Sequence, residues 1–542
     1  MSAPLKAIKN TLRILGPAMK KNKIKEAAAH QTQPLDKLVF YGTVVITGAA
    51  VMMVELLGTR IIGPFYGVSL IVWSSLLSVS LLALSMGYYL GGHCADKNSP
   101  WRLPHAVIAA ALLIAVIPLL AKPVQLFFDT LGLRWGALSS AFVLFTPPLL
   151  FLGMAGPFVI RMATDRLEHV GSTAGNVYAI STIGSVVGTL MLGFYLLPLF
   201  GVKTILLALS LVLLCLALGL VYYEKARMKV LHPPLSWLGV SAVLIIFVAW
   251  QIVSNGRPSS DQNYQVLFEQ ETHYGWVRVV QQKDKDIRWL MSDASTIGAE
   301  HVPSGAGLLG YQTVVRLLPW FNPEGKKALL IGLGAGHLVN DLANYGVKTD
   351  AIEIDPAVAY TAGEYFNFKP TGKVIVGDAR YQVHQLAEQY DLIIHDCFTG
   401  GSEPTHLLSQ EMIAELKTKL NPGGVLAVNF VGFTDEQQLK PVQSVARTLD
   451  SVFAYRKTFV RTPGESFSDY IFVVSDSELN SGQHPNSTVP HQWLSEREVS
   501  IAADGGELIT DDYNPLEYLQ IAKAEHYRNV LVDRVGQSIL FR

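Results

Sequence analysis

Long apolar segments dominate the first half of the chain. Stretches of roughly 20 apolar residues, the length that crosses a bilayer, occur near residues 38–58, 68–91, 104–121, 138–160, 176–200, 203–223 and 235–254. This pattern predicts an N-terminal all-α transmembrane helix bundle of about seven spans. In the fifth segment, Gly184 and Gly188 are four residues apart, a spacing that favours close contact with another helix.

The second half has a different pattern, and the polar residues 255–263 mark the change. Residues 264–293 hold short runs of β-branched and aromatic residues, which predict a small antiparallel β-sheet. An apolar-periodic helix is expected at Gly305–Leu318.

From residue 328 onward, the chain alternates between short apolar runs and amphipathic segments. The predicted strands are 328–331, 350–354, 373–376, 391–395 and 424–430. The predicted helices are 337–345, 356–366, 380–389, 408–420 and 434–449. Such alternation is typical of a mostly parallel sheet with helices on both faces, a Rossmann-like α/β fold.

These patterns divide the chain into five parts. They are a basic N-terminal tail (1–37), a transmembrane domain (38–254), a small β-sheet and helix (264–325), a Rossmann-like nucleotide-binding catalytic domain (326–520) and a C-terminal tail (521–542).

A glycine loop follows the first strand of the predicted parallel sheet. Gly332, Gly334 and Gly336 come directly after an apolar run, and Glu353 lies about 20 residues further on, near the end of the next strand. Glycines let a ligand approach the backbone closely, and a carboxylate suits the two hydroxyl donors of a ribose. The pattern therefore predicts a nucleotide site; the alternative is a tight turn with an exposed Glu353.

Two more acidic residues end strands at the same edge of the sheet. Asp378 can accept from an adenine amine while the Ala379 N–H serves a ring nitrogen, or it caps the following helix. Asp396 can hold a cationic amine and take its proton, or it is an ordinary surface residue. Ligands in such sheets bind at the carboxyl ends of the strands, where all these groups are expected to meet.

The end of the chain carries a further acidic pair, Asp511 and Asp512, followed by Tyr513. These three residues either line a pocket for a cationic acceptor or cap a short helix.

The distribution of basic residues bears on topology. The tail at 1–37 carries eight Lys and Arg residues and either lies on anionic lipid or is disordered. With seven spans, 15 Lys and Arg residues lie on the side of the N-terminus and 4 on the other, which predicts a multi-pass protein of the cell (inner) membrane with a cytoplasmic N-terminus. The C-terminal domain would then lie outside, whereas a nucleotide ligand favours the cytoplasm; one span more or fewer removes this conflict.

Composition excludes several other classes. The chain of 542 residues has a net charge of −1 at pH 7, so no overall field attracts nucleic acid. Its three cysteines provide neither a disulfide framework nor the spacing of a metal site, and no metal is expected. The sequence leaves open whether the chain forms a homo-oligomer.

Several motifs together resemble a known family. LLIGLGAG, AIEIDP, VGDAR, YDLIIHDCF, PTHLLSQE, LNPGGVLAVN and TDDYNP are similar to those of the polyamine aminopropyltransferases, the spermidine synthase family. The layout most resembles the membrane-fused bacterial members, which have N-terminal transmembrane helices. The resemblance implies an AdoMet-dependent methyltransferase-like fold and transfer of an aminopropyl group from decarboxylated S-adenosylmethionine to a small amine, with release of methylthioadenosine.

The resemblance also implies roles for individual residues. Glu353 would bind the ribose, Asp378 the adenine, and Asp396 would orient and deprotonate the attacking amine. Tyr311, Gln312 and Tyr513 match positions of the substrate pocket.

Two positions depart from the family pattern. Soluble members carry an Asp in the glycine loop where this chain has Ala335, and a second acid three residues after the first where it has Thr399. Buried ammonium groups need charged partners, so intact S-adenosylmethionine or a different acceptor becomes plausible. The alternatives are an AdoMet-dependent methyltransferase and a non-catalytic nucleotide-sensing or transport membrane protein.

Overall fold

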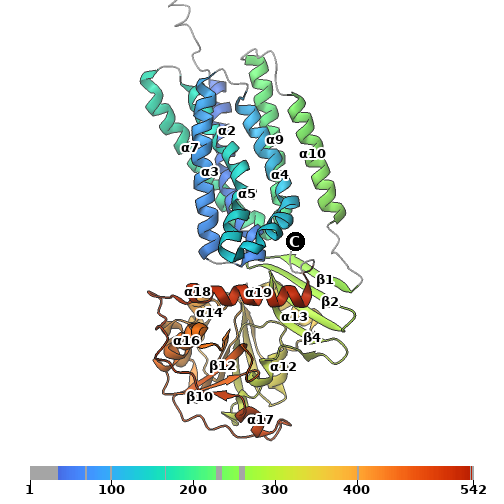
Figure 1. Cartoon of the computed structure of the whole chain (residues 1–542), viewed down its shortest axis with the longest axis vertical. Helices are drawn as coiled ribbons and strands as arrows, with labels where there is room; N and C mark the ends of the chain where they lie inside the picture. The colour runs from blue at the N-terminus through green and yellow to red at the C-terminus, as the bar shows by residue number, and fades with distance from the viewer. Residues whose placement is uncertain are drawn as a thin grey trace, which may run out of the picture.

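The chain folds into a helical bundle and an α/β domain stacked against one end of it (Figure 1). The computed structural model describes residues 34–67, 70–97, 101–164, 167–227, 235–255, 263–398, 402–536 and residue 539. Residues 1–33, which make up most of the predicted basic tail, and Thr399 lie outside the described residues.

The bundle consists of long apolar helices. They are α2 (Pro34–Tyr66), α3 (Leu70–Asp96), α4 (Leu103–Phe128), α5 (Gly132–Gly153), α6 (Ala155–Ala163), α7 (Val170–Met191), α9 (Val202–Arg227) and α10 (Leu235–Asn255). Each predicted apolar segment coincides with one or two of them. Among the described residues, five helical runs are long and apolar enough to cross a membrane, the longest being the 61 residues of Leu103–Ala163.

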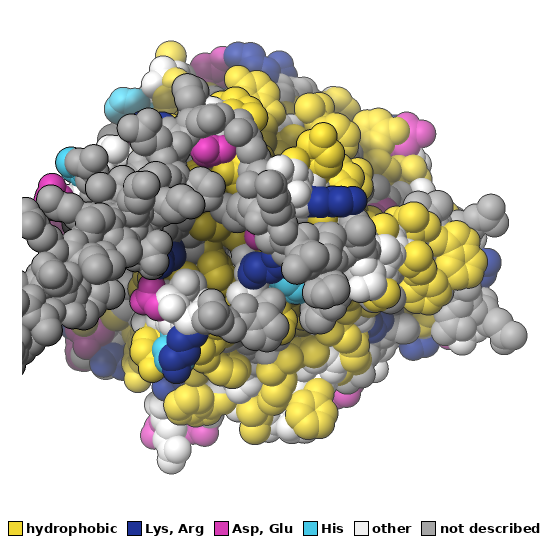
Figure 2. Space-filling view, turned by 90° about the horizontal axis from the view of Figure 1, so that it is seen from above, with side chains coloured by type: hydrophobic (Ala, Val, Ile, Leu, Met, Phe, Trp, Pro, Cys, Tyr) yellow, Lys and Arg dark blue, Asp and Glu magenta, His cyan; other side chains and the backbone are white. Residues whose placement is uncertain are grey.

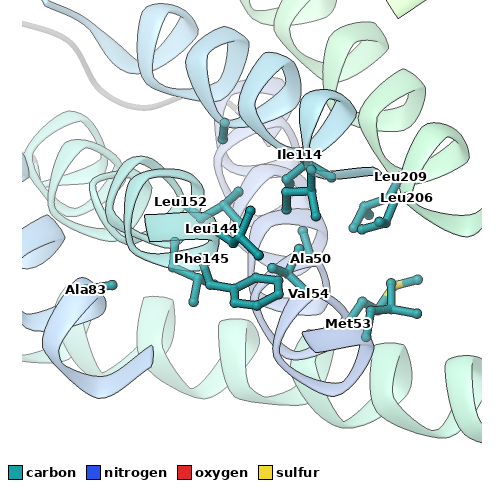
Figure 3. Close-up of a cluster of buried hydrophobic side chains, with 14 of the residues drawn as sticks. Ala50, Met53, Val54, Ala83, Ile114, Leu144, Phe145, Leu152, Leu206 and Leu209 are labelled. Carbon is teal, nitrogen blue, oxygen red and sulfur yellow. The ribbon is translucent and has the colours of Figure 1, made fainter. Parts of the chain in front are cut away.

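Apolar side chains occupy both the inside and the outside of the bundle. Ala50 and Val54 of α2 meet Leu144 and Phe145 of α5 in the interior (Figure 3). On the outside, large side chains such as that of Leu81 are 69% exposed. Seen from the far end of the bundle, hydrophobic side chains form much of the outer surface that the structure describes (Figure 2). Such an exposed apolar surface is typical of helices that contact lipid.

Helices α2 and α7 pack closely because α7 carries small residues on the shared face. A Cβ atom added to Gly188 would lie 2.8 Å from the Cβ of Ala49, and Gly184 rests on the backbone of Val45. Both glycines are buried. The predicted role of this pair in helix contact is therefore confirmed.

A small antiparallel sheet begins the C-terminal part. Its strands pair in chain order: β1 (Tyr264–Glu271), β2 (Trp276–Gln282), β3 (Ile287–Ser292), β4 (Ser295–His301) and β5 (Ala306–Gly307). The helix expected at Gly305–Leu318 is wrong in extent. Ala306 and Gly307 pair with β4 instead, and the α-helix there, α11, covers only Gln312–Val315.

The main sheet has eight strands in the order β13-β11-β12-β10-β9-β6-β7-β8. The strands are β6 (Lys327–Ile331), β7 (Lys348–Glu353), β8 (Val374–Val376), β9 (Tyr390–His395), β10 (Leu420–Phe433), β11 (Tyr455–Val460), β12 (Phe467–Ser475) and β13 (Glu498–Val499). Strands β6 to β10 are parallel, while β12, β11 and β13 are antiparallel to their neighbours. The mostly parallel sheet predicted from the sequence is confirmed.

Alternate residues of the parallel strands serve two separate cores. Leu329 and Ile331 point to one hydrophobic cluster, and Ala328 and Leu330 point to the other. The helices involved are α12 (His337–Ala343), α13 (Pro356–Tyr365), α14 (Ala379–Gln385), α15 (Gln410–Thr418) and α16 (Lys440–Asp450). Burial on both faces explains why these strands are continuous apolar runs.

The segment expected as a C-terminal tail forms helix α19 (Ile521–Val535), which lies between the bundle and the α/β domain (Figure 1). On the bundle side, the Arg528 guanidinium forms an ion pair with Asp129 and lies 4.3 Å from the ring centroid of Phe65. On the domain side, the rings of Tyr527 and Phe398 are in edge contact at 5.0 Å. One helix therefore contacts both halves of the molecule.

Candidate active site

A cavity of about 670 Å³ lies at the carboxyl ends of the parallel strands. Its walls come from the small sheet, the glycine loop, the ends of β7, β9, β10 and β12, and helix α19. This is the edge at which ligands of open α/β sheets bind. Eight of the residues predicted for the site line it: Tyr311, Gln312, Gly332, Gly334, Glu353, Asp378, Ala379 and Asp396.

The glycine loop needs its glycines for conformation and for space. Gly332, Gly334 and Gly336 have φ angles of 91°, 53° and 79°, in the region that favours glycine. A Cβ atom on Gly332 would collide with the Asp396 carbonyl oxygen, which ties the loop to the end of β9. Gly336 packs on the ring of Phe368 rather than lining the cavity.

Glu353 connects the end of β7 to this loop. Its Oε2 accepts a hydrogen bond from the Leu333 N–H and its Oε1 accepts one from the Asp355 N–H, both at 3.0 Å. Burial raises the pKa of this carboxyl, while the two backbone donors act in the opposite direction. A carboxylate has about four acceptor sites, so two remain for hydroxyl donors in the cavity.

Asp378 is the N-cap of α14 and also borders the cavity. Its Oδ1 accepts a hydrogen bond from the Tyr381 N–H at 3.0 Å. The other oxygen is not needed for the cap. The two interpretations of Asp378, as helix cap and as adenine acceptor, are therefore compatible in this geometry.

Asp396 is fixed by two donors from different parts of the chain. The Tyr311 hydroxyl donates to its Oδ2 at 2.7 Å, and the Asn429 side-chain amide donates to its Oδ1 at 2.9 Å. Burial raises the pKa of Asp396 to about 6, because the effect of burial is larger than the opposing effect of these two donors. A carboxylate with such a pKa is partly protonated near neutrality and is suited to proton transfer.

A further carboxylate in the cavity, that of Asp469, was not predicted. Asp469 of β12 pairs with Val431 of β10 in the antiparallel register, which brings it to the edge where the parallel strands end. Burial raises the pKa of Asp469 to about 6, and the charge of Asp396 also raises it. No spacing in the sequence points to Asp469, because it reaches the site through an antiparallel strand.

Helix α19 closes the same cavity, although no cavity wall was predicted there. His526, Tyr527 and Arg534 of α19 line it. The Lys523 ammonium of α19 forms an ion pair with Glu403, and both side chains are almost fully buried. The amphipathic spacing of residues 521–535 is the sequence signal of this helix, whereas the predicted element was a tail.

Asp511, Asp512 and Tyr513 are exposed and lie outside the cavity lining. The Arg380 Nη1 donates to Asp511 Oδ1 at 2.8 Å, and this bond lowers the pKa of the Asp511 carboxyl. The Thr510 hydroxyl accepts from the Tyr513 N–H. In this structure the segment forms a turn before helix α18 (Leu516–Leu519) instead of a pocket wall.

Ala335 also lies outside the cavity lining. It is 2% exposed and belongs to a small apolar cluster with Val277, Leu290 and Phe366. A Cβ atom added to Gly298 would lie 2.6 Å from the Ala335 Cβ, so strand β4 and the glycine loop are in close contact there. An aspartate at 335 would therefore be buried against β4, and this loop position offers no partner for a substrate ammonium.

Within the described parts of the chain, no group of three or more His, Cys, Asp or Glu side chains is arranged to hold a metal ion. Acidic side chains outnumber basic ones around the cavity: Glu353, Asp355, Asp378, Asp396, Glu465 and Asp469 line it, together with Arg461 and Arg534. Such a set suits a ligand that combines a ribose with positive charge.

The C-terminal region is similar to known proteins. Residues 309–481 match the family model of the spermine/spermidine synthase domain. A probable polyamine aminopropyl transferase of Bifidobacterium longum is 26% identical over 328 residues, which cover 54% of this chain and 72% of that protein. A polyamine aminopropyltransferase of Vibrio vulnificus is 38% identical over 116 residues, covering 20% and 39%.

A relative of another kind is also similar. An N-terminal histidine N-methyltransferase of Emericella nidulans is 27% identical over 244 residues, covering 40% of this chain and 43% of that protein. The chain thus spans less than half the length of two of these three relatives. The C-terminal region contains a spermine/spermidine synthase domain, and the domain and its relatives indicate a transferase.

Proposed function

We propose that this protein is a membrane-bound transferase that moves an aminopropyl group from decarboxylated S-adenosylmethionine to an amine and releases methylthioadenosine. The observation that carries the proposal is the cavity in which Glu353, Asp378 and Asp396 follow three parallel strands. Glu353 and Asp378 hold the adenosine, and Asp396 meets the amine. The match to a spermine/spermidine synthase domain supports this choice of reaction.

The reaction needs alignment and one proton acceptor. The amine nitrogen attacks the carbon next to the sulfonium, a C–N bond forms, and the C–S bond breaks with its electron pair going to sulfur. The proton of the amine passes to the carboxylate of Asp396, which Tyr311 and Asn429 hold in place. Positioning and proton transfer of this kind account for large rate increases without a covalent intermediate.

An AdoMet-dependent methyltransferase is the second candidate. The burial of Ala335 favours it, because this chain has no acid at the position that carries one in soluble aminopropyltransferases, and the ammonium of intact S-adenosylmethionine is balanced by its own carboxylate. The similarity to an N-methyltransferase points the same way.

Product analysis separates the two reactions. Purified protein is incubated with S-adenosylmethionine or its decarboxylated form and a panel of amines. Methylthioadenosine from the decarboxylated donor supports aminopropyl transfer. S-adenosylhomocysteine from the intact donor supports methylation, and formation of neither product with any amine contradicts both.

We further propose that the bundle crosses the cell membrane seven times and that the N-terminus is cytoplasmic. The proposal rests on the apolar outer surface of the bundle and on where its helices begin and end. Helix α2 begins at the end remote from the α/β domain, and α10 ends beside that domain (Figure 1). An odd number of crossings produces this arrangement.

A further inference from the structure

The small antiparallel sheet contacts both the bundle and the glycine loop. Figure 1 shows β1 and β2 beside the end of the bundle that faces the α/β domain. Successive side chains of a strand point to opposite faces of its sheet. Val280 of β2 packs in the hydrophobic cluster of the bundle. Val277 and Val279 pack in a second cluster, which contains Ala335 of the glycine loop. One sheet therefore joins the bundle to the loop that borders the cavity.

The turn between β1 and β2 is held on the bundle side by two contacts. The Val202 N–H, at the start of α9, donates to Glu271 Oε2 at 2.7 Å. The Arg60 guanidinium of α2 donates to the His273 carbonyl oxygen. The first N–H groups of a helix have no partner within that helix, and a carboxylate there also interacts favourably with the helix dipole. The positions of α2 and α9 therefore fix the position of this turn.

Thr272 of the same turn contacts the α/β domain. Its hydroxyl donates to Asp355 Oδ2 at 2.5 Å. The hydroxyl oxygen accepts from the N–H groups of Tyr274 and Gly275 at 3.1 and 3.2 Å. The Gly275 carbonyl oxygen is a second acceptor for the hydroxyl proton, at the longer distance of 3.0 Å. Because a carboxylate is the stronger acceptor, the hydroxyl links the turn to Asp355.

Asp355 connects this hydroxyl to the proposed ribose carboxylate. Asp355 lines the cavity and is 3% exposed. Its Oδ1 accepts from the Ala357 N–H at 2.9 Å as the N-cap of α13, and its own N–H donates to Glu353 Oε1 at 3.0 Å. Burial raises the pKa of Asp355, and the bond from Thr272 acts in the opposite direction. Removal of the Thr272 hydroxyl would take a donor from a buried carboxylate, which costs free energy.

We propose that Thr272 is a positioning residue for the nucleotide site and that the bundle, by holding the turn at residues 271–275, keeps Glu353 in its binding position. The bundle then has a role beyond attachment to the membrane, because it supports the carboxylate that holds the ribose. This inference rests on the proposed function, since it concerns the nucleotide of that reaction. Adenosine is common to the ligands of both candidate reactions, so the inference applies to either of them.

The first test is equilibrium binding of methylthioadenosine, which does not depend on turnover. The full-length protein in detergent is titrated calorimetrically as the wild type, Thr272→Val and Thr272→Ser. Valine keeps the shape of threonine and removes the hydroxyl, so Thr272→Val is expected to bind at least about fivefold more weakly. Serine keeps the hydroxyl, so Thr272→Ser should stay within about twofold of the wild type. Wild-type affinity in Thr272→Val, or an equal loss in both variants, overturns the assignment of Thr272.

Variants of the bundle alone test its part in this arrangement. Arg60→Met together with Val202→Pro removes both donors to the turn and leaves the sequence of the turn unchanged. Proline is tolerated at the first position of a helix, where Val202 lies. This double variant is expected to bind methylthioadenosine at least about fivefold more weakly than the wild type.

The matched control changes the contacts of the bundle with α18, whose residues are outside the cavity lining. Arg134→Met together with Leu70→Pro removes the arginine from the Tyr518 ring and takes from Glu517 the N–H donor at the start of α3. Its affinity for methylthioadenosine should stay within about twofold of the wild type, because these contacts are remote from the site.

Unfolding midpoints show which of these variants fold. Equal losses of affinity in the two double variants, or unchanged affinity after Arg60→Met with Val202→Pro, refute the role of the bundle. If that double variant does not fold, Arg60→Met alone decides, and unchanged affinity in this single variant refutes the role.

The outcomes distinguish this inference from the proposed function. If the wild type binds methylthioadenosine and every variant binds it equally well, the inference is wrong and the proposed reaction still stands. If the wild type binds no methylthioadenosine, both are wrong, since the cavity then holds no adenosine nucleotide.

Discussion

At the scale of single residues, the carboxylate of Asp396 is oriented before any substrate arrives. Each of its oxygens accepts a hydrogen bond, one from Tyr311 and one from Asn429. Tyr311 remains a donor because burial and the nearby negative charge raise the pKa of its hydroxyl. A preoriented carboxylate loses little entropy when an amine binds, so its basicity is directed at the incoming nitrogen.

Replacing this base tests its role. Asp396→Asn is expected to reduce turnover by roughly 10²–10⁴-fold, the usual effect of losing a general base. Affinity for methylthioadenosine should stay within a few-fold, because Glu353 and Asp378 are unchanged. Rate and binding are measured on the same preparation. Turnover close to that of the wild type would rule out proton transfer to Asp396, and loss of binding together with folding would mean that the residue only fixes its loop.

The raised pKa of Asp396 predicts a pH dependence. The base acts in its ionised form, so kcat/KM, expressed for the unprotonated amine, should fall as the pH drops through about 6 rather than about 4. Asp469 titrates in the same range and interacts with Asp396, so the profile reports both groups. The effect of pH on stability has the opposite direction. Because the pKa is raised in the fold, ionisation of this carboxyl destabilises the fold above pH 6, and the destabilisation disappears as the pH falls. A rate that stays level down to pH 4.5 would contradict the prediction.

In the proposed site, Glu353 is the residue that binds the ribose of the nucleotide. Glu353→Ala should weaken methylthioadenosine binding at least tenfold, or about 1.4 kcal/mol, because two ribose hydroxyls lose a charged acceptor. The same carboxylate also holds Leu333 and Asp355, so part of the loss comes from the loop. Glu353→Gln, which keeps one acceptor, should fall between the alanine variant and the wild type. Calorimetric titration measures all three, and equal affinities would place the ribose elsewhere.

The predicted site residues that line the cavity share one property. Gly332, Glu353, Asp378 and Asp396 each follow a parallel strand whose own sequence is a short apolar run, so their position at the sheet edge follows from local pattern alone. Asp469 lies near the start of an antiparallel strand. Its place beside Asp396 depends on the pairing of β12 with β10, which is a tertiary choice that periodicity does not encode.

At the scale of elements, those defined by a local pattern were predicted, and those that depend on tertiary contacts were not. Strand β9 and helices α13 and α15 lie within about two residues of their predicted bounds, because each is a regular apolar pattern with a clear beginning. Residues 521–535 were predicted as a tail, although their pattern is amphipathic. The position of α19 depends on its contacts with two separate domains, and a local pattern does not encode such contacts. Its function as a cavity wall is therefore a property of the assembled chain.

The buried ion pair between α19 and the domain is expected to stabilise that arrangement. Lys523→Met leaves Glu403 charged and unpaired, which typically costs about 3–5 kcal/mol when a pair is fully buried. The double variant Lys523→Met with Glu403→Gln should recover part of this loss, since the uncompensated charge is gone. Thermal unfolding midpoints in detergent compare the variants with Lys440→Met, which removes an exposed pair with Glu507 and should cost about 0–1 kcal/mol. A midpoint for Lys523→Met equal to that of Lys440→Met would show that the pair contributes little.

At the scale of the whole molecule, the basic residues at the near end of the bundle contact the α/β domain. The Arg60 guanidinium donates to the His273 carbonyl oxygen, and Arg134 lies 5.7 Å from the ring centroid of Tyr518. Basic residues at a bundle end usually indicate the cytoplasmic side. Here the few on the near side have protein partners, so the stronger topological signal is the excess of Lys and Arg at the opposite end.

Site-directed labelling tests the resulting topology. Single cysteines are introduced as Ala28→Cys in the N-terminal segment and as Gln483→Cys in the α/β domain, in a chain whose Cys94, Cys215 and Cys397 are replaced by serine or alanine. A membrane-impermeant thiol reagent is then applied to intact cells and to permeabilised ones. Seven spans with a cytoplasmic N-terminus predict that position 483 reacts in intact cells and that position 28 reacts only after permeabilisation.

The reason is geometric. Helix α2 begins at one end of the bundle and α10 finishes at the other, so a bundle that spans the membrane crosses it an odd number of times between these two points. Reaction of both cysteines from one side would require one crossing more or fewer. Reaction of neither in intact cells would put the nucleotide site in the cytoplasm, and the conflict between the number of spans and the nucleotide ligand would disappear. Opposite sides would instead require the donor to reach a catalytic domain outside the cytoplasm. The labelling pattern therefore decides where the transferase meets its nucleotide.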